Sequence, residues 1–75
     1  MARSARRLVL CLKNEGYEAS LETRKVYVAL PDETAAKHRL MRVIDESGDD
    51  YLYPQQFFAP VELPPALRRA VLAAA

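Results

Sequence analysis

Four carboxylates crowd one short stretch of the sequence, on either side of a glycine. They are Asp45, Glu46, Asp49 and Asp50, and the glycine is Gly48. Hard cations bind several carboxylate oxygens, so the stretch has the residue types of a metal site. The spacing does not fit, because calcium-binding loops place acids at alternate positions and a glycine at the sixth, whereas Gly48 is fourth in this tight turn. We expect these carboxylates to stay solvated, and we expect neither a metal nor another cofactor.

Two other side chains are of types that catalyse reactions. Cys11 lies within an apolar run, where a thiol behaves as a small hydrophobic group and its pKa tends to rise. His38 has no cysteine, second histidine or suitably placed acid nearby in the sequence, so neither zinc binding nor general-base catalysis is supported. The chain has only two glycines, Gly16 and Gly48, too far apart for a phosphate-binding loop. The sequence therefore predicts that the protein is not an enzyme.

The composition indicates one small globular domain spanning residues 1–75. A chain of 75 residues buries only about 60% of the surface that it exposes when unfolded, so the core should be thin. The net charge of +1 selects no class of charged partner. One cysteine cannot form an intramolecular disulfide, and the apolar run 8–12 is too short for a signal peptide. We expect a cytoplasmic location and no membrane association.

The first half of the chain predicts two strands behind a basic N-terminus. Residues 1–7 are expected to be flexible, and the apolar run 8–12 predicts the first strand. Residues 24–30 alternate and predict the second strand. One face of this strand would carry Val26, Val28 and Leu30, and the other Lys25, Tyr27 and Ala29. Pro31 ends the strand, since proline has no N–H to donate to a neighbouring strand.

A short helical turn and a β-hairpin are predicted next. Asp32 can cap a helical turn over residues 35–38, which we expect to lie in a loop outside the core. Residues 40–44 are apolar on both faces, as expected for a strand that packs inside a barrel and also contacts a neighbouring segment. The sequence 46–48 favours a hairpin turn with its glycine at positive φ, after which residues 50–53 return antiparallel.

The end of the chain predicts one more strand and a helix. Residues 54–57 suit a single 3₁₀ turn, and residues 58–63 the last strand, which Pro60 marks as an edge. A helix is expected over residues 65–74, with one apolar stripe formed by Leu67, Ala70, Val71 and Ala74. Such a short helix is unstable alone and must dock on the barrel or on another chain, so a homodimer is compatible with the sequence.

The segment Tyr51-Leu52-Tyr53-Pro54-Gln55-Gln56-Phe57-Phe58-Ala59-Pro60-Val61 resembles the closing strand, 3₁₀ turn and final strand of SH3 domains, where an aliphatic-Pro-x-x-aromatic-Val-x-Pro pattern recurs. Over most of its length the chain also resembles a group of small bacterial proteins of uncharacterised function, through Cys11 and the segments 14–22, 25–27, 30–32 and 42–54. These resemblances imply a mainly β fold, a small SH3-like antiparallel barrel of about five strands with a short C-terminal helix. They imply no activity.

The SH3 resemblance also suggests a binding surface. SH3 domains hold polyproline segments in an aromatic groove, and the resemblance places Leu52, Pro54 and Phe57 there, with Tyr53 in the core. Simple alternation instead puts Tyr51 and Tyr53 on one face, so the sequence leaves the buried face open. The chain has no tryptophan, which argues against proline-rich ligands. We expect a binding module whose contact surface includes Tyr51, Leu52, Pro54 and Phe57; alternatively, the aromatic side chains fill the core.

A protein partner is expected, with nucleic acid as the alternative. Small barrels bind RNA or DNA through basic and aromatic side chains. The cations that could form such a face beside Tyr17 or Tyr27 are Arg3, Arg6, Arg7, Lys13, Arg24, Lys25, Lys37, Arg39 and Arg42. Phosphate neutralisation needs several clustered cations, and the acidic turn would repel phosphate on its own side. Where these cations lie in the folded protein therefore separates the two alternatives.

Overall fold

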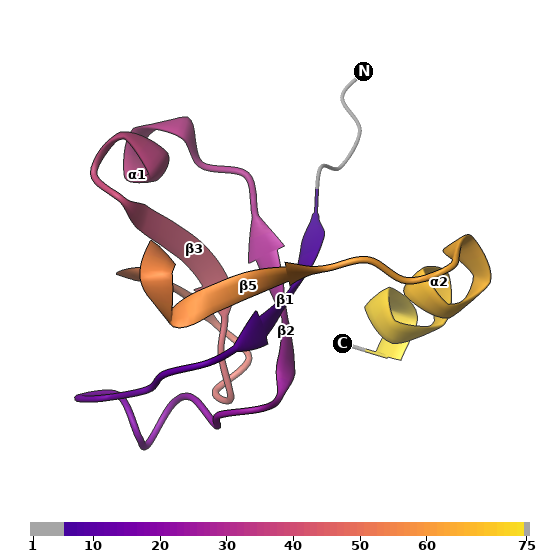
Figure 1. Ribbon diagram of the computed structural model, residues 1–75, viewed down its shortest axis with the longest axis horizontal. Coiled ribbons are helices and arrows are strands. Elements are labelled where there is room, and N and C mark those ends of the chain that lie inside the picture. Colours follow the sequence, from indigo (N-terminus) through magenta and orange to yellow (C-terminus); the bar gives the residue numbers. More distant parts are fainter. Residues whose placement is uncertain (1–5, 75) are drawn as a thin grey trace.

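The computed structural model describes residues 6–74 of the 75-residue chain. The fold is mainly β, with five antiparallel strands in one sheet and a C-terminal helix, as expected (Figure 1). The elements are β1 (Arg7–Cys11), β2 (Val26–Leu30), α1 (Glu33–Lys37), β3 (Leu40–Ile44), β4 (Asp50–Pro54), the 3₁₀ turn η1 (Gln55–Phe57), β5 (Phe58–Val61) and α2 (Pro65–Ala74). Of the N-terminus that was expected to be flexible, residues 1–5 lie outside the described residues, and Arg7 begins β1.

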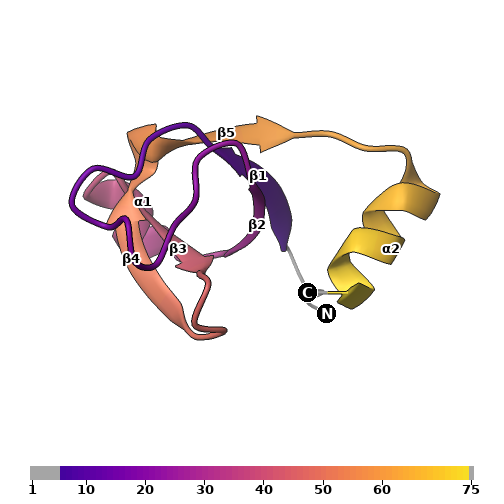
Figure 2. The same ribbon diagram turned by 90° about the horizontal axis from the view of Figure 1, so that it is seen from below.

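The strand order in the sheet is β4-β3-β2-β1-β5. The sheet is curved, so its strands follow an arc around the core (Figure 2). Among the described residues β4 and β5 are the two edges and do not pair with each other, so a closed barrel is not established. Pro60 lies in the edge strand β5, as predicted, because an edge strand tolerates a residue without an N–H.

The concave side of the sheet carries the main core. The buried residues that pack together there are Val9, Cys11, Leu21, Tyr27, Ala29, Val43, Tyr53, Phe57 and Phe58. Aromatic rings bridge the gap between the two edge strands, since the ring centroids of Tyr53 and Phe58 are 6.3 Å apart in an edge-to-face arrangement. Side chains thus join β4 to β5 where backbone hydrogen bonds do not.

The convex side of the sheet carries a second apolar layer. Val61, Leu8, Val28 and Ile44 lie directly opposite one another across β5, β1, β2 and β3. In β2 the aliphatic face therefore points outward, and Tyr27 points into the core. The helix α2 stands beside this convex side (Figure 2).

The helix α1 connects β2 to β3 and is capped as expected. The carboxylate of Asp32 accepts a hydrogen bond from the backbone N–H of Ala35 at 2.9 Å. The expectation that this segment would lie entirely outside the core is wrong, because α1 packs against β3 and Ala35 is buried. A methyl side chain lets the helix approach the sheet closely.

Candidate functional site

The predicted contact residues lie at different depths. Tyr51 is 53% exposed on the edge strand β4, and the neighbouring Leu52 is also exposed. Pro54 is partly buried at the end of β4. Phe57 is only 6% exposed and belongs to the core. The surface available to a partner is therefore Tyr51, Leu52 and part of Pro54, and Phe57 is not part of it.

A cluster of aromatic rings packs around Tyr53, which lies in the same strand as Tyr51 and Leu52. Tyr17, on the loop between β1 and β2, packs edge-to-face on Tyr53 with centroids 5.0 Å apart and on Phe57 at 5.9 Å. Tyr53 is buried, which agrees with the position implied by the SH3 resemblance. Tyr17 is itself 40% exposed, so its ring is also accessible to a partner. The sequence suggested Tyr17 only as part of a nucleic-acid-binding face.

Three of the four hairpin carboxylates, Glu46, Asp49 and Asp50, belong to exposed residues, as expected, and Asp45 is the exception. Asp45 is only 6% exposed. One of its carboxylate oxygens accepts from the backbone N–H and the hydroxyl of Ser47, at 2.8 and 2.6 Å. The other accepts from the Tyr53 hydroxyl at 2.5 Å. A buried carboxylate with this many donors is stabilised as the anion, so Asp45 holds the hairpin together.

The next residue, Glu46, binds a second tyrosine, Tyr27. The carboxylate of Glu46 accepts from the Tyr27 hydroxyl at 2.5 Å and pairs with the Lys25 ammonium at 2.6 Å. The Tyr27 hydroxyl in turn accepts from the backbone N–H of Glu22 at 2.7 Å, and the backbone N–H of Glu46 donates to the Ser20 carbonyl at 3.0 Å. The hairpin thereby anchors the long loop between β1 and β2.

These contacts shift the pKa values of the groups involved. Burial alone would raise the pKa of Asp45, but the hydrogen bonds from Ser47 and Tyr53 outweigh it and hold that pKa below its usual value. The Lys25 ammonium and the Tyr27 hydroxyl likewise lower the pKa of Glu46. Burial, together with the adjacent carboxylate, raises the pKa of Tyr53 and of Tyr27. Both hydroxyls therefore stay protonated as donors at neutral pH.

Arg42 makes a further structural connection, between α1 and the edge strand. Its guanidinium donates to Asp32 at 2.8 Å and to Asp50 at 2.9 Å. Asp32 is the N-cap of α1, and Asp50 begins β4. One of the cations considered for nucleic-acid binding is thus already paired on both sides.

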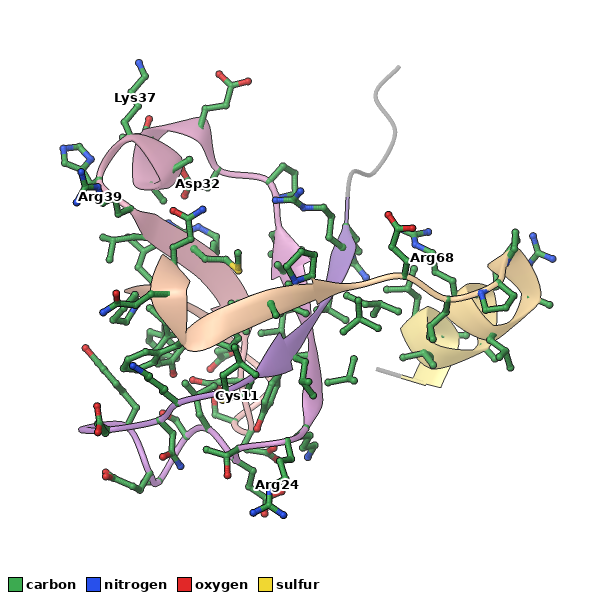
Figure 3. All side chains as sticks on the ribbon, in the orientation of Figure 1. Cys11, Arg24, Asp32, Lys37, Arg39 and Arg68 are labelled. Carbon is green, nitrogen blue, oxygen red and sulfur yellow. The ribbon has the colours of Figure 1, made fainter. Side chains whose placement is uncertain are left out.

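Among residues 6–74 the remaining cations form small groups and no single basic face, and the largest group holds Arg68, which donates to the Arg6 carbonyl and lines a pocket with Arg7 and Glu62. Figure 3 shows Lys37 and Arg39 beside α1, Arg24 at the opposite end of the molecule and Arg68 toward α2. In the part of the chain that the structure describes, no group of three or more His, Cys, Asp or Glu residues is placed to hold a metal ion. Cys11 is fully buried, and burial raises the pKa of its thiol. The exposed His38 ring contacts the Thr34 carbonyl of its own helix at 3.0 Å.

Sequence reasoning missed the tyrosine–carboxylate pairs. The available signal was a tyrosine at an inward strand position combined with acids in the adjacent turn, since a buried phenol hydroxyl needs an acceptor.

None of the helices within residues 6–74 has the length and apolar character needed to cross a membrane. Comparisons with protein-family models, with curated proteins and with solved structures found no match to this chain.

Proposed function

We propose that this chain is a non-catalytic module of SH3-like architecture that binds another protein through its edge strand β4. The observation that carries the proposal is the exposure of Tyr51 and Leu52 on a strand whose outer edge has no neighbouring strand among the described residues. An unpaired strand edge offers N–H and C=O groups that an extended peptide can join. Exposed side chains on both faces of that strand would then select the peptide.

The aromatic cluster around Tyr53 supports the same proposal. The packed rings of Tyr17, Tyr53 and Phe57 hold the end of β4 in place. Pro54 restricts the backbone where β4 meets η1. A pre-ordered surface loses little conformational entropy on binding, which favours affinity. The order of β4, η1 and β5 along the chain also matches what the SH3 resemblance implies for the closing segment.

A protein partner is favoured over nucleic acid by the distribution of charge. Lys37 and Arg39 lie beside α1, Arg24 at the opposite end of the molecule and Arg68 toward α2 (Figure 3). Arg68 and Arg7 share their pocket with the carboxylate of Glu62, and Lys25 and Arg42 are paired with carboxylates. A surface that binds phosphates needs several cations together.

The single cysteine, Cys11, is buried as a free thiol, which suits the reducing environment of the cytoplasm. The proposed location of this module is therefore the cytoplasm.

Affinity capture with the full chain as bait tests the proposal. The double variant Tyr51→Ala, Leu52→Ala should lose the protein partner recovered with the unmodified chain, because it removes both exposed side chains of β4. The matched control is Leu12→Ala, which truncates a side chain of similar exposure, 52%, on the loop after β1. Equal recovery by the double variant and the control, with both folded, would refute the β4 surface.

A further inference from the structure

A pocket lies at the end of β4, next to the surface proposed above. It has a volume of about 300 Å³ and is lined by Arg39, Leu40, Pro54, Gln55 and Gln56. Leu40 on β3 is directly opposite Pro54 on β4. Pro54 and the exposed Leu52 are two positions apart, so they share one face of the strand. The pocket therefore adjoins the side chains that we propose to contact a protein partner.

The outward-facing backbone groups of β4 lead up to this pocket. The backbone N–H of Gln55 donates to the Arg39 carbonyl at 2.9 Å, which adds one hydrogen-bonded pair to the end of the β3–β4 ladder. Such pairs alternate along antiparallel strands. The backbone groups of Asp50, Leu52 and Pro54 therefore point away from β3, and proline has no N–H. An extended peptide that joins β4 can form hydrogen bonds as far as the Pro54 carbonyl, where the pocket begins.

The polar side chains that line the pocket have no partner within the described residues. Arg39 is exposed, and its guanidinium forms neither a hydrogen bond nor an ion pair with any residue of 6–74. The side-chain amides of Gln55 and Gln56 are also exposed and without a partner in this part of the chain. Arg42 on β3 differs, because two carboxylates already hold it. The pocket therefore offers N–H donors that can bind an acceptor.

The charge around the pocket favours an anion. Lys37 and Arg39 both lie beside α1 (Figure 3), and none of the described acids lines the pocket. At the other end of β4, Asp49 is exposed. A carboxylate on a bound peptide would be repelled by Asp49 and attracted by Arg39. Charge thus distinguishes the two ends of the β4 surface.

We propose that the segment bound at β4 is an extended peptide with a carboxylate that enters this pocket, an inference that rests on the function proposed above. The Arg39 guanidinium and the amides of Gln55 and Gln56 donate to the carboxylate. A guanidinium can donate two parallel hydrogen bonds to a carboxylate, which gives geometric selectivity. Because the pocket begins two residues past Leu52, the carboxylate lies about two to four residues along the peptide from the side chain beside Leu52. It belongs to an aspartate, a glutamate or the C-terminus of the peptide.

Selection of random peptides, displayed with free C-termini, on the immobilised full chain tests the ligand class. The β4 ligands are those selected peptides that the double variant Tyr51→Ala, Leu52→Ala no longer binds. They should share a carboxylate at the stated spacing from an apolar residue. Synthetic peptides with the acid replaced by its amide, or with an amidated C-terminus, identify which carboxylate binds. Loss of the correct one should weaken binding about 10-fold or more.

The variant Arg39→Gly tests the pocket, with Arg24→Gly as the matched control. Arg24 is also an exposed arginine with a left-handed backbone, with φ of 68° against 60° for Arg39. It lies at the opposite end of the molecule (Figure 3) and does not line the pocket. Glycine relieves the backbone strain at both positions, so both variants should stay folded. Arg39→Gly should bind the selected peptides about 10-fold more weakly and with a smaller dependence on salt, whereas Arg24→Gly should bind as the unmodified chain does.

Failure of the pocket and failure of the β4 surface give different results. Peptides that depend on Tyr51 and Leu52 but share no carboxylate would overturn the pocket and leave the β4 surface standing. Equal affinity of Arg39→Gly and Arg24→Gly for these peptides would do the same. If the double variant still binds every selected peptide, or if no peptide is selected, the β4 surface fails and the pocket fails with it.

Discussion

At the scale of single residues, the carboxylates of the hairpin act as structural acceptors. Asp45 receives three hydrogen bonds, from the backbone and hydroxyl of Ser47 and from the hydroxyl of Tyr53. Every buried side-chain nitrogen or oxygen in the described residues has a partner. Satisfying a buried anion in this way stabilises one conformation of the hairpin, because few other arrangements supply all three donors.

Replacing Asp45 by asparagine should destabilise the protein. An amide has one acceptor oxygen, so either Ser47 or Tyr53 would face an NH₂ group instead of an acceptor. A buried donor without an acceptor costs about 1 to 3 kcal/mol, which chemical denaturation can measure. Asp49→Asn is the control, because this carboxylate is exposed in the same hairpin, and it should change the unfolding free energy by less than about 0.5 kcal/mol.

The difference in unfolding free energy between the unmodified chain and Asp45→Asn should depend on pH, with a sign that follows from the pKa shift of Asp45. Because folding lowers the pKa of Asp45, its stabilising effect is complete above the unfolded value of about 3.9 and is lost as the pH falls through the folded value. The difference in unfolding free energy between the unmodified chain and Asp45→Asn should therefore shrink in acid. Other carboxylates with lowered pKa values, such as Glu46, are present in both proteins and cancel. A difference independent of pH down to full protonation would contradict this role.

At the scale of elements, the turn before β4 and the turn after α1 both depend on a left-handed backbone. Gly48 has φ of 90° in the hairpin between β3 and β4, as predicted. Arg39 has φ of 60° just after α1, where its N–H donates to the Ala36 carbonyl at 3.0 Å. Glycine adopts this conformation without strain, whereas a side chain at the same φ is disfavoured. One turn therefore uses the favoured residue, and the other does not.

Substitutions at these two turns should have effects of opposite sign. Gly48→Ala should lower the unfolding free energy by about 1 kcal/mol, and the cost is confined to the backbone because no atom lies within 4 Å of the added Cβ. Arg39→Gly should raise it by up to about 1 kcal/mol, reduced by the greater freedom of glycine in the unfolded chain. Denaturation midpoints measure both. An unchanged midpoint for Gly48→Ala would contradict the assigned turn.

The order and boundaries of the elements were largely predictable from sequence, because they depend on local chemistry. Proline stops, the turn glycine and the Asp32 cap act within a few residues, and the strands lie within a few residues of their predicted positions. The inward face of β2 was not predictable, since Tyr27 points inward for a carboxylate 19 positions away. The burial of Asp45 was missed although its partner Tyr53 lies only eight positions away, on the strand that returns from the same hairpin.

At the scale of the whole molecule, the sheet separates two apolar layers of unequal completeness. The concave layer is closed by aromatic rings from β4, η1 and β5, and the convex layer is only partly covered by α2 (Figure 2). A chain of 75 residues has a net stability of about 4 to 11 kcal/mol, so a few side chains of the concave layer carry much of it. Substitutions of buried side chains in the concave layer should therefore lower the free energy of unfolding, whereas substitutions of exposed side chains should change binding with little effect on stability.

Truncating Phe57 and Tyr51 to alanine tests that separation. Phe57 is buried against Tyr17 and Phe58, so Phe57→Ala leaves a cavity in the core and should cost about 3 to 5 kcal/mol of unfolding free energy. Tyr51 lies six positions before Phe57 in the chain but is 53% exposed, so Tyr51→Ala should cost less than about 0.5 kcal/mol. Far-UV circular dichroism during denaturation measures both. If Phe57→Ala were as stable as Tyr51→Ala, Phe57 would not be a core residue, and the sequence-based assignment of Phe57 to the contact surface would be the better one.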